Sequence, residues 1–122
     1  MSHVTVLAGG GGAAKFLVGL VDVLPEEEIH VIANVADDYE MSGLHICPDI
    51  DRILYSLAGE VDPHRGSTRT HETYHCQDTI RKLGVRSRAR IGDHEMATQL
   101  IRSSLLNGGA NLEEVTSELA DR

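Results

Sequence analysis

The sequence is poor in aromatic residues and in positive charge. Only 3% of its 122 residues are Phe, Trp or Tyr, there is no Trp, and the formal net charge is −8. A surface that binds single-stranded nucleic acid needs aromatic platforms for stacking and a basic groove for the backbone. We therefore expect no nucleic-acid partner, and any phosphate must be bound locally by backbone amides, a metal ion or a few basic side chains.

Cysteines and long apolar runs are also scarce. The two cysteines, Cys47 and Cys76, are too few for a disulfide framework, and no CxxC pair indicates zinc. No apolar run approaches the length that spans a membrane. The N-terminus leads straight into a predicted strand, without the basic segment of a signal peptide. These features are typical of a cytoplasmic protein with reduced thiols and no membrane contact.

The first third of the chain has the pattern of a strand, a glycine-rich loop, a helix and a second strand. Residues 4–8 form a β-branched apolar run typical of a buried parallel strand. A loop over 9–12 precedes a predicted helix over 13–24, which Pro25 ends. Residues 29–33 form the second apolar run. This order predicts a βαβ unit, which is nearly always right-handed.

The remainder is predicted to be mostly helical. Expected helices run from Pro48 to Gly59, over 71–83, over 93–107, and onward from a pair resembling a capping box, Asn111 and Glu114. Loops are expected over 34–45 and 60–70, and a short strand or extended segment over 85–91. The fold class is therefore α/β, a single Rossmann-like domain over 1–122 with a three-layer core and a small parallel sheet. Such a small sheet leaves edges unpaired, so we expect an incomplete domain or one that needs a partner, for which a second copy is one candidate.

The glycine-rich loop is the first candidate site. Gly9, Gly11 and Ala14 match G-x-G-x-x-G/A directly after a strand and at a helix start, which is the context the motif requires. A backbone without side chains can approach a phosphate closely, and the free N–H groups of the helix then point at the anion. Lys15 could add a point charge, although no Ser or Thr follows it as in a Walker A motif. A tight turn without a ligand is the alternative that this context disfavours.

Acidic residues follow the second strand and open the next helix. Asn34, Asp37 and Asp38 lie at the carboxyl edge of the predicted sheet, where ligands bind in open α/β folds. One carboxylate there could hold a ribose, or two could hold Mg²⁺ together with phosphate oxygens. The alternative is a solvated acidic loop. Asp49 and Asp51 fall in the first turn of a helix, where a favourable interaction with the helix dipole would by itself explain them.

Two further motifs have competing interpretations. Residues 71–75 read H-E-x-x-H, which on a helix places two zinc ligands one turn apart with Glu as the base. The polar flanking residues Arg69 and Gln77 make a zinc peptidase the weaker hypothesis. Asp93, after a glycine, is typical of a cap on the predicted helix over 93–107, and an isolated His45 is more often structural than functional.

Taken together, these segments resemble the 2-phospho-L-lactate transferase (CofD-like) family, which includes the phosphoenolpyruvate transferases of deazaflavin biosynthesis. Four stretches carry the resemblance, of which the third is the most specific: Leu7–Phe16, Asn34–Tyr39, Gly43–Asp51 and Gly92–Thr98. Residues 108–122 are similar to the family's glycine turn and following helix. The similarity therefore spans nearly the whole chain.

The resemblance implies a Mg²⁺-dependent enzyme with a Rossmann-like core. Such enzymes transfer a phospholactyl or phosphoenolpyruvyl group from a GDP-linked donor to the deazaflavin alcohol Fo, releasing GMP and forming the precursor of coenzyme F(420). By position, Asp37 and Asp49 would be catalytic and bind the metal, with Asp51 as a further metal ligand. The residues expected to bind the donor are Gly9, Gly10, Gly11, Gly12, Lys15, Asn34, His45 and Asp93.

This chemistry agrees with the residues present. Such a transfer needs charge neutralisation at the diphosphate and in-line placement of the acceptor hydroxyl, and no nucleophile triad. The resemblance covers the N-terminal portion of a longer family domain, so three other hypotheses stay open. They are a nucleotide-binding Rossmann module without transfer chemistry, an inactive truncated homologue, and the zinc peptidase.

Overall fold

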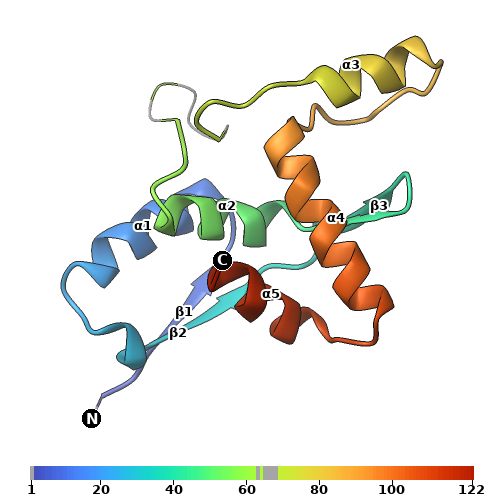
Figure 1. Ribbon diagram of the computed structural model, residues 1–122. Coiled ribbons are helices and arrows are strands. Elements are labelled where there is room, and N and C mark those ends of the chain that lie inside the picture. The colour runs from blue at the N-terminus through green and yellow to red at the C-terminus, as the bar shows by residue number, and fades with distance from the viewer. Residues whose placement is uncertain (1, 63, 65–68) are drawn as a thin grey trace. The chain divides into compact units, whose positions relative to one another are not determined.

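The computed structural model describes residues 2–62, 64 and 69–122 (Figure 1). Contacts between Cα atoms divide the chain into two compact units, residues 1–38 with 47–68, and residues 39–46 with 69–122. The elements in chain order are β1 (Val4–Ala8), α1 (Gly11–Val21), η1 (Glu26–Glu28), β2 (Ile29–Ala33), β3 (Tyr39–Met41), β4 (Leu44–Ile46), α2 (Pro48–Leu57), α3 (His75–Lys82), α4 (Asp93–Asn107) and α5 (Leu112–Ala120). The prediction that residues 1–122 form a single Rossmann-like domain stays a prediction.

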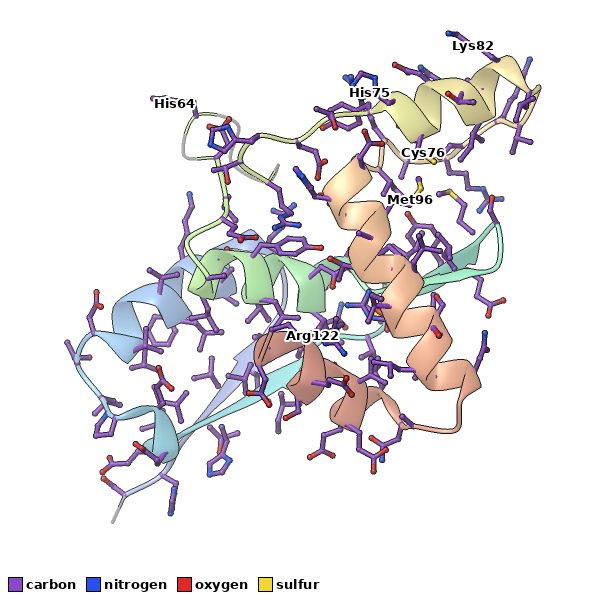
Figure 2. All side chains as sticks on the ribbon, in the orientation of Figure 1. His64, His75, Cys76, Lys82, Met96 and Arg122 are labelled. Atoms are coloured by element: carbon purple, nitrogen blue, oxygen red, sulfur yellow. The ribbon has the colours of Figure 1, made fainter. Side chains whose placement is uncertain are left out.

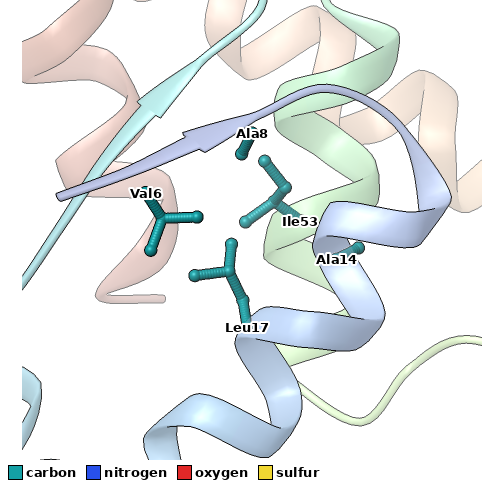
Figure 3. Packing of buried hydrophobic residues seen from close by; sticks show 5 residues of the cluster. All are labelled: Val6, Ala8, Ala14, Leu17 and Ile53. Carbon is teal, nitrogen blue, oxygen red and sulfur yellow. The ribbon is translucent and has the colours of Figure 1, made fainter. Parts of the chain in front are cut away.

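The first unit contains the predicted βαβ motif. β1 and β2 pair in parallel, from Val4 opposite Ile29 to Ala8 opposite Ala33, and α1 lies between them in the chain. Alternate strand residues and helix residues three or four apart share a face. The buried core accordingly combines residues of β1, α1 and α2, namely Val6, Ala8, Ala14, Leu17 and Ile53 (Figure 3).

The opposite face of this two-stranded sheet is exposed. Leu7 and Ile32 are register partners, and their side chains are 79% and 58% exposed. Both precede residues that face the core, so they point to the other side of the sheet. The predicted class is confirmed as α/β with a small parallel sheet, and the bare apolar face fits an incomplete domain.

The second unit contains an antiparallel hairpin that the sequence analysis placed in a loop. β3 and β4 pair through a two-residue turn, Ser42 and Gly43, whose φ angles are 53° and 78°. Positive φ at both positions is the geometry of a type I′ turn, which suits the twist of a hairpin. The loop predicted over 34–45 is therefore wrong from residue 39 onward.

The hairpin packs on the helices of its own unit. Ile46 of β4 forms a buried cluster with Ile91 and Met96, the latter labelled on α4 in Figure 2. Partly buried Tyr39 and Met41 of β3 pack against this cluster. The alternating apolar side chains of both strands therefore lie on one face of the hairpin.

Helix positions agree with the sequence at some ends and differ at others. α2, α4 and α5 match their predictions, and Asn111 and Glu114 exchange two 2.9 Å bonds as a capping box. α1 begins two residues earlier than predicted, so Gly11 and Gly12 form its first turn, and it ends at Val21. The predicted loop over 60–70 falls partly on residues 63 and 65–68, which lie outside the described residues.

The segment between α3 and α4 is not a strand. Its residues 85–91 are held by side chains, because Gln77 donates to the carbonyl of Ala89 at 2.6 Å and accepts from the Ile91 N–H at 3.3 Å. Within the described part of the chain, no helix is both long and apolar enough to cross a membrane.

Candidate functional site

The glycine-rich segment connects β1 directly to α1. β1 ends at Ala8 and α1 begins at Gly11, so the first turn of α1 opens at the carboxyl edge of β1. The first turn holds no acidic residue, and no described side chain caps it. The N–H groups of that turn have no acceptor within the helix. The predicted strand–loop–helix geometry is therefore confirmed, and it presents free donors at this edge.

The N-terminal half of α2 lies against the start of α1. A β-carbon at Gly10 would lie 3.6 Å from Oδ1 of Asp49, and one at Gly11 would lie 2.9 Å from Nη1 of Arg52. Gly9 and Gly12 would meet nothing within 4 Å. Among these four glycines, Gly11 alone makes room for a neighbour by lacking a side chain, because a separation of 2.9 Å is shorter than a carbon–nitrogen contact.

Asn34 joins two of the predicted carboxylates. Its Nδ2 donates to Oδ2 of Asp49 at 2.8 Å and to Oδ2 of Asp37 at 3.2 Å. Its backbone N–H donates to the carbonyl of Ala8 at 2.8 Å, which places Asn34 at the end of β2 beside β1. The structure therefore brings Asn34, Asp37 and Asp49 together at the carboxyl edge of the sheet.

This cluster fits the demands of a magnesium ion. Mg²⁺ is bound in proteins by one or two carboxylates together with phosphate oxygens and waters. Asp37 is exposed and Asp49 is partly buried, and each has a second oxygen that is not bonded to Asn34. A single neutral amide therefore joins two carboxylates of the kind that bind Mg²⁺.

Asp51 is placed differently from Asp49. It is 4% exposed and lies two positions later on α2, a turn of about 200° around the helix. The two side chains therefore leave α2 in nearly opposite directions. The resemblance implied all three aspartates as metal ligands, whereas the structure gathers only Asp37 and Asp49 around Asn34.

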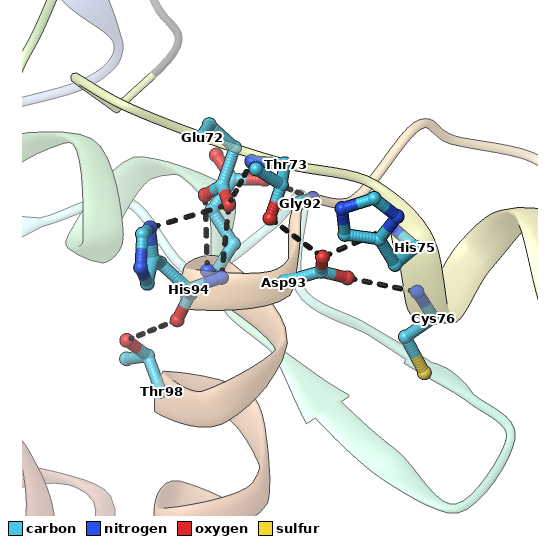
Figure 4. A network of polar contacts seen from close by, with 9 residues as sticks. Glu72, Thr73, His75, Cys76, Gly92, Asp93, His94 and Thr98 are labelled. Carbon is cyan, nitrogen blue, oxygen red and sulfur yellow. Dashed lines mark hydrogen bonds and ion pairs between the residues drawn. The ribbon is translucent and has the colours of Figure 1, made fainter.

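His45 and Asp93 belong to the second unit. His45 lies in β4, and its backbone N–H donates to Oγ of Ser103 at 2.8 Å. Asp93 is the first residue of α4, and its carboxylate bonds to the start of α3 (Figure 4). Oδ2 accepts from Oγ1 of Thr73 at 2.7 Å and from the N–H of His75 at 2.9 Å, and Oδ1 accepts from the N–H of Cys76 at 2.9 Å.

These hydrogen bonds shift the pKa of the Asp93 carboxyl. The hydrogen bond from Thr73, followed by that from the N–H of Cys76, lowers the pKa of the Asp93 carboxyl below its ordinary value. Hydrogen bonds to the ionised form favour it over the neutral form. Both oxygens of Asp93 cap α3. The expectation that Asp93 caps the helix over 93–107 is therefore wrong, because α4 begins at Asp93 and its N-cap is Gly92.

Glu72 caps the start of α4 in the same way. Its Oε1 accepts from the N–H of His94 at 2.9 Å, and its Oε2 accepts from the N–H of Glu95 at 3.2 Å. The Glu72 side chain is only 1% exposed, and Nδ1 of His94 lies 3.5 Å from Oε1. α3 and α4 are therefore capped reciprocally: Asp93, the first residue of α4, caps α3, and Glu72, which precedes α3, caps α4 (Figure 4).

The exchange of caps overturns the zinc-peptidase hypothesis. α3 begins at His75, and His71 lies before it with a φ of 58°, so the two histidines are not one turn apart on a helix. Glu72, the base in that hypothesis, is buried and committed to α4. The predicted helix over 71–83 is wrong at its start because Asp93 caps the chain at His75.

Comparison with known proteins decides the family. Residues 4–122 match the family described as 2-phospho-L-lactate transferase CofD. The chain belongs to the CofD family. The resemblance seen in the sequence is thereby confirmed over nearly the whole chain.

Several relatives of this CofD family chain are named phosphoenolpyruvate transferases. The protein from Nocardia farcinica is 41% identical over 121 residues, which are 98% of this chain and 36% of the relative. The protein from Streptomyces avermitilis is 39% identical over 121 residues, covering 98% and 38% of the two chains. That from Mycobacterium tuberculosis is 37% identical over 133 residues, covering 98% and 40%. The chain spans about two-fifths of the length of these relatives.

Two residues of this CofD family chain were missed by the sequence analysis. Arg52 lies three positions after Asp49, a spacing that puts both on one face of a helix, so the spacing could have indicated it. Glu72 was considered only as a zinc-site base. Its role as a cap depends on Gly92, where a β-carbon would lie 2.0 Å from Cδ of Glu72, and no local pattern reveals that contact.

Proposed function

We propose that this chain forms the donor-binding portion of a Mg²⁺-dependent transferase of the CofD family. The donor is GDP-linked, with a phospholactyl or phosphoenolpyruvyl group joined to GMP through a diphosphate, and the acceptor is the hydroxyl of the deazaflavin Fo. Membership of the family and the names of the relatives support the transfer chemistry. The observation that carries the assignment is Asn34, which holds Asp37 and Asp49 together at the edge where α1 begins.

The proposed reaction replaces the anhydride bond of the donor's diphosphate with a phosphate ester bond to the acceptor. The acceptor oxygen forms a bond to the phosphorus of the transferred group, the bond from that phosphorus to the bridging oxygen breaks, and GMP leaves with that oxygen. The acceptor's proton passes to solvent. Little covalent help is needed, because positioning and charge neutralisation supply most of the catalysis in phosphoryl transfer.

The described residues have separate parts in this proposal. Asp37 and Asp49 hold Mg²⁺, which neutralises charge on the diphosphate when bound. Asn34 orients both carboxylates through its amide. The N–H groups of the first turn of α1 bind phosphate oxygens, and the exposed Lys15 adds a positive charge beside them. His45 stays a proposed donor-binding residue, whereas the oxygens of Asp93 are already occupied by the cap on α3.

The test measures binding of GDP with and without Mg²⁺. A ligand that binds only the folded chain raises its unfolding free energy by about 2.7 kcal/mol at a concentration a hundred times its Kd. We expect GDP with Mg²⁺ to raise the midpoint of thermal unfolding, and EDTA to remove the effect. The absence of any shift with GDP and Mg²⁺ would overturn the proposal.

Two aspartate variants locate the metal. Asp37→Asn should lose the Mg²⁺-dependent part of the GDP effect, because an amide is a weaker ligand than a carboxylate. Asp22→Asn is the matched control, since Asp22 is an exposed residue at the other end of α1. Equal Mg²⁺ dependence in Asp37→Asn and the wild type would remove Asp37 from the site.

The strand–glycine–helix segment from β1 to α1 also fits a second function, that of a nucleotide-binding module without transfer chemistry. A nucleotide-binding module without transfer activity would bind GDP but release no GMP when given the donor and Fo. A module of the dinucleotide type would instead bind NAD without a metal, and Asp37→Asn would weaken its contact with ribose. Release of GMP that depends on Fo would exclude both forms of this alternative.

A further inference from the structure

We propose that Arg52 binds the diphosphate of the donor where α1 begins. This inference rests on the proposed function, because it assigns a residue to the same donor site. Arg52 lies on α2, one turn after Asp49, and both side chains reach the first residues of α1. Residues three apart on a helix share a face. The metal-binding carboxylate and this guanidinium therefore lie on the same side of α2.

The contact between Arg52 and Gly11 is close. A β-carbon at Gly11 would lie 2.9 Å from Nη1, 3.6 Å from Cδ and 3.9 Å from Cζ of Arg52. The side chain thus lies across the first residue of α1 and occupies space that only glycine leaves free. Gly11 is half-buried, whereas Gly10 and Gly12 beside it are exposed.

The charges at this place lack a counterion for the guanidinium. The N-terminus of a helix carries about half a positive charge, and the first turn of α1 has no acidic residue. Among the residues that the structure describes, Arg52 forms no hydrogen bond and no ion pair. Asp49, one turn earlier on α2, bonds to Asn34 instead.

A cation placed at the positive end of a helix is unfavourable unless an anion binds between them. Arginine is suited to a phosphate because its planar guanidinium donates two parallel hydrogen bonds to phosphate oxygens. The N–H groups of α1 point at the same anion. A diphosphate satisfies both sets of donors, and its remaining oxygens are available to a metal held by Asp37 and Asp49.

The test compares ligands with and without the diphosphate. Affinities for GDP and for guanosine, both with Mg²⁺, are measured by calorimetry for the wild type, Arg52→Gln and Arg52→Lys. We expect Arg52→Gln to bind GDP about ten- to a hundredfold more weakly, as for other hydrogen bonds between charged groups, and guanosine as the wild type does. Arg52→Lys keeps the positive charge but cannot donate two parallel hydrogen bonds, so its loss of GDP affinity should be smaller than that of Arg52→Gln.

Controls separate this role from a structural one. Arg81→Gln removes an exposed arginine on α3 and should leave GDP binding unchanged. Gly11→Ala keeps Arg52 but places a β-carbon 2.9 Å from Nη1, so it should displace the guanidinium and weaken GDP binding. Thermal unfolding without ligand shows whether each variant folds. If Arg52→Gln does not fold, the comparison of Arg52→Lys with the wild type remains the test.

The outcomes distinguish the two proposals. A wild-type chain that does not bind GDP with Mg²⁺ would overturn the proposed function and this inference with it. A wild-type chain that binds, with equal GDP affinity in the folded Arg52 variants, would overturn this inference alone. Equal losses for GDP and guanosine would also overturn it, because the diphosphate would not be the group that Arg52 recognises.

Discussion

The side-chain nitrogen of Asn34 lies 2.8 Å from Oδ2 of Asp49, a residue 15 positions further along the chain. The same nitrogen donates to Asp37 at 3.2 Å. Two carboxylates brought close together repel each other, and a shared neutral donor reduces that cost while fixing their orientation. Two acidic segments that are separate in the sequence thereby become a single group of oxygen ligands.

Replacing Asn34 should weaken metal binding more than it weakens folding. Asn34→Ala removes the amide that orients both carboxylates, and loss of such a supporting group costs metal affinity by about 10- to 100-fold. The measurement is the Mg²⁺ concentration that gives half of the GDP-induced rise in unfolding temperature. Asn107→Ala, at the exposed end of α4, is the control. An unchanged Mg²⁺ midpoint in Asn34→Ala would show that Asn34 does not organise the ligands.

Gly92→Ala should destabilise the second unit. A β-carbon there would lie 2.0 Å from Cδ of the buried Glu72, so the carboxylate must leave the N–H groups that it caps. Losing a helix cap of this kind costs about 0.5–2 kcal/mol. Urea unfolding of the wild type and the variant measures the difference.

A double variant tests this explanation. In a Glu72→Ala background the space beside Gly92 is empty, so adding Gly92→Ala should lower the free energy of unfolding much less than it does in the wild type. Residues in contact show such non-additivity, whereas independent sites do not. Equal costs in the two backgrounds would mean that Gly92 is needed for some other reason.

Gly19→Ala should raise the stability of the chain, whereas Gly92→Ala should lower it. Gly19 lies inside α1, is exposed, and a β-carbon there would meet nothing within 4 Å. Glycine in a helix interior is about 1 kcal/mol less favourable than alanine, since it loses more backbone freedom on folding. Thermal or urea unfolding should therefore show a gain of about that size, and a loss of stability would contradict the open surroundings of Gly19.

Local patterns in the sequence predicted much of the fold. The apolar run of β1 and the spacing of Ala14 and Leu17 depend on residues close in the chain, and both appear in the core as expected. The cap at Asn111 involves a residue only three positions away. The hairpin was missed because its turn, Ser42 and Gly43, was interpreted as part of a small, acidic loop, although both positions have the positive φ of a type I′ turn.

The candidate site was predictable in its residue types but not in its contacts. The rule that ligands bind at the carboxyl ends of parallel strands placed Asn34 and Asp37 together. Nothing local separates Asp49 from Asp51, because burial and the direction of each side chain around α2 decide which one meets Asn34. Glu72 and His94 are 22 positions apart, and only the packing of α3 and α4 shows that one caps the other.

The pH dependence of stability should reveal the cap formed by Asp93. Hydrogen bonds from Thr73, Cys76 and His75 lower the pKa of this carboxyl from its ordinary value of 3.8. In acid the unfolded chain therefore takes up this proton before the folded chain does, which favours unfolding. The contribution of Asp93 is fully present above about pH 4 and is lost as the pH falls through the lowered pKa of the folded chain.

Asp93→Asn isolates that contribution from those of the other carboxylates. Urea unfolding between pH 2.5 and pH 6 should show a smaller acid-induced loss of stability in Asp93→Asn than in the wild type, with the two curves converging at the acid end. Asp121→Asn, which removes an exposed carboxylate at the end of α5, should keep the wild-type dependence. Parallel curves for Asp93→Asn and the wild type would mean that the hydrogen bonds to Asp93 do not favour its ionised form.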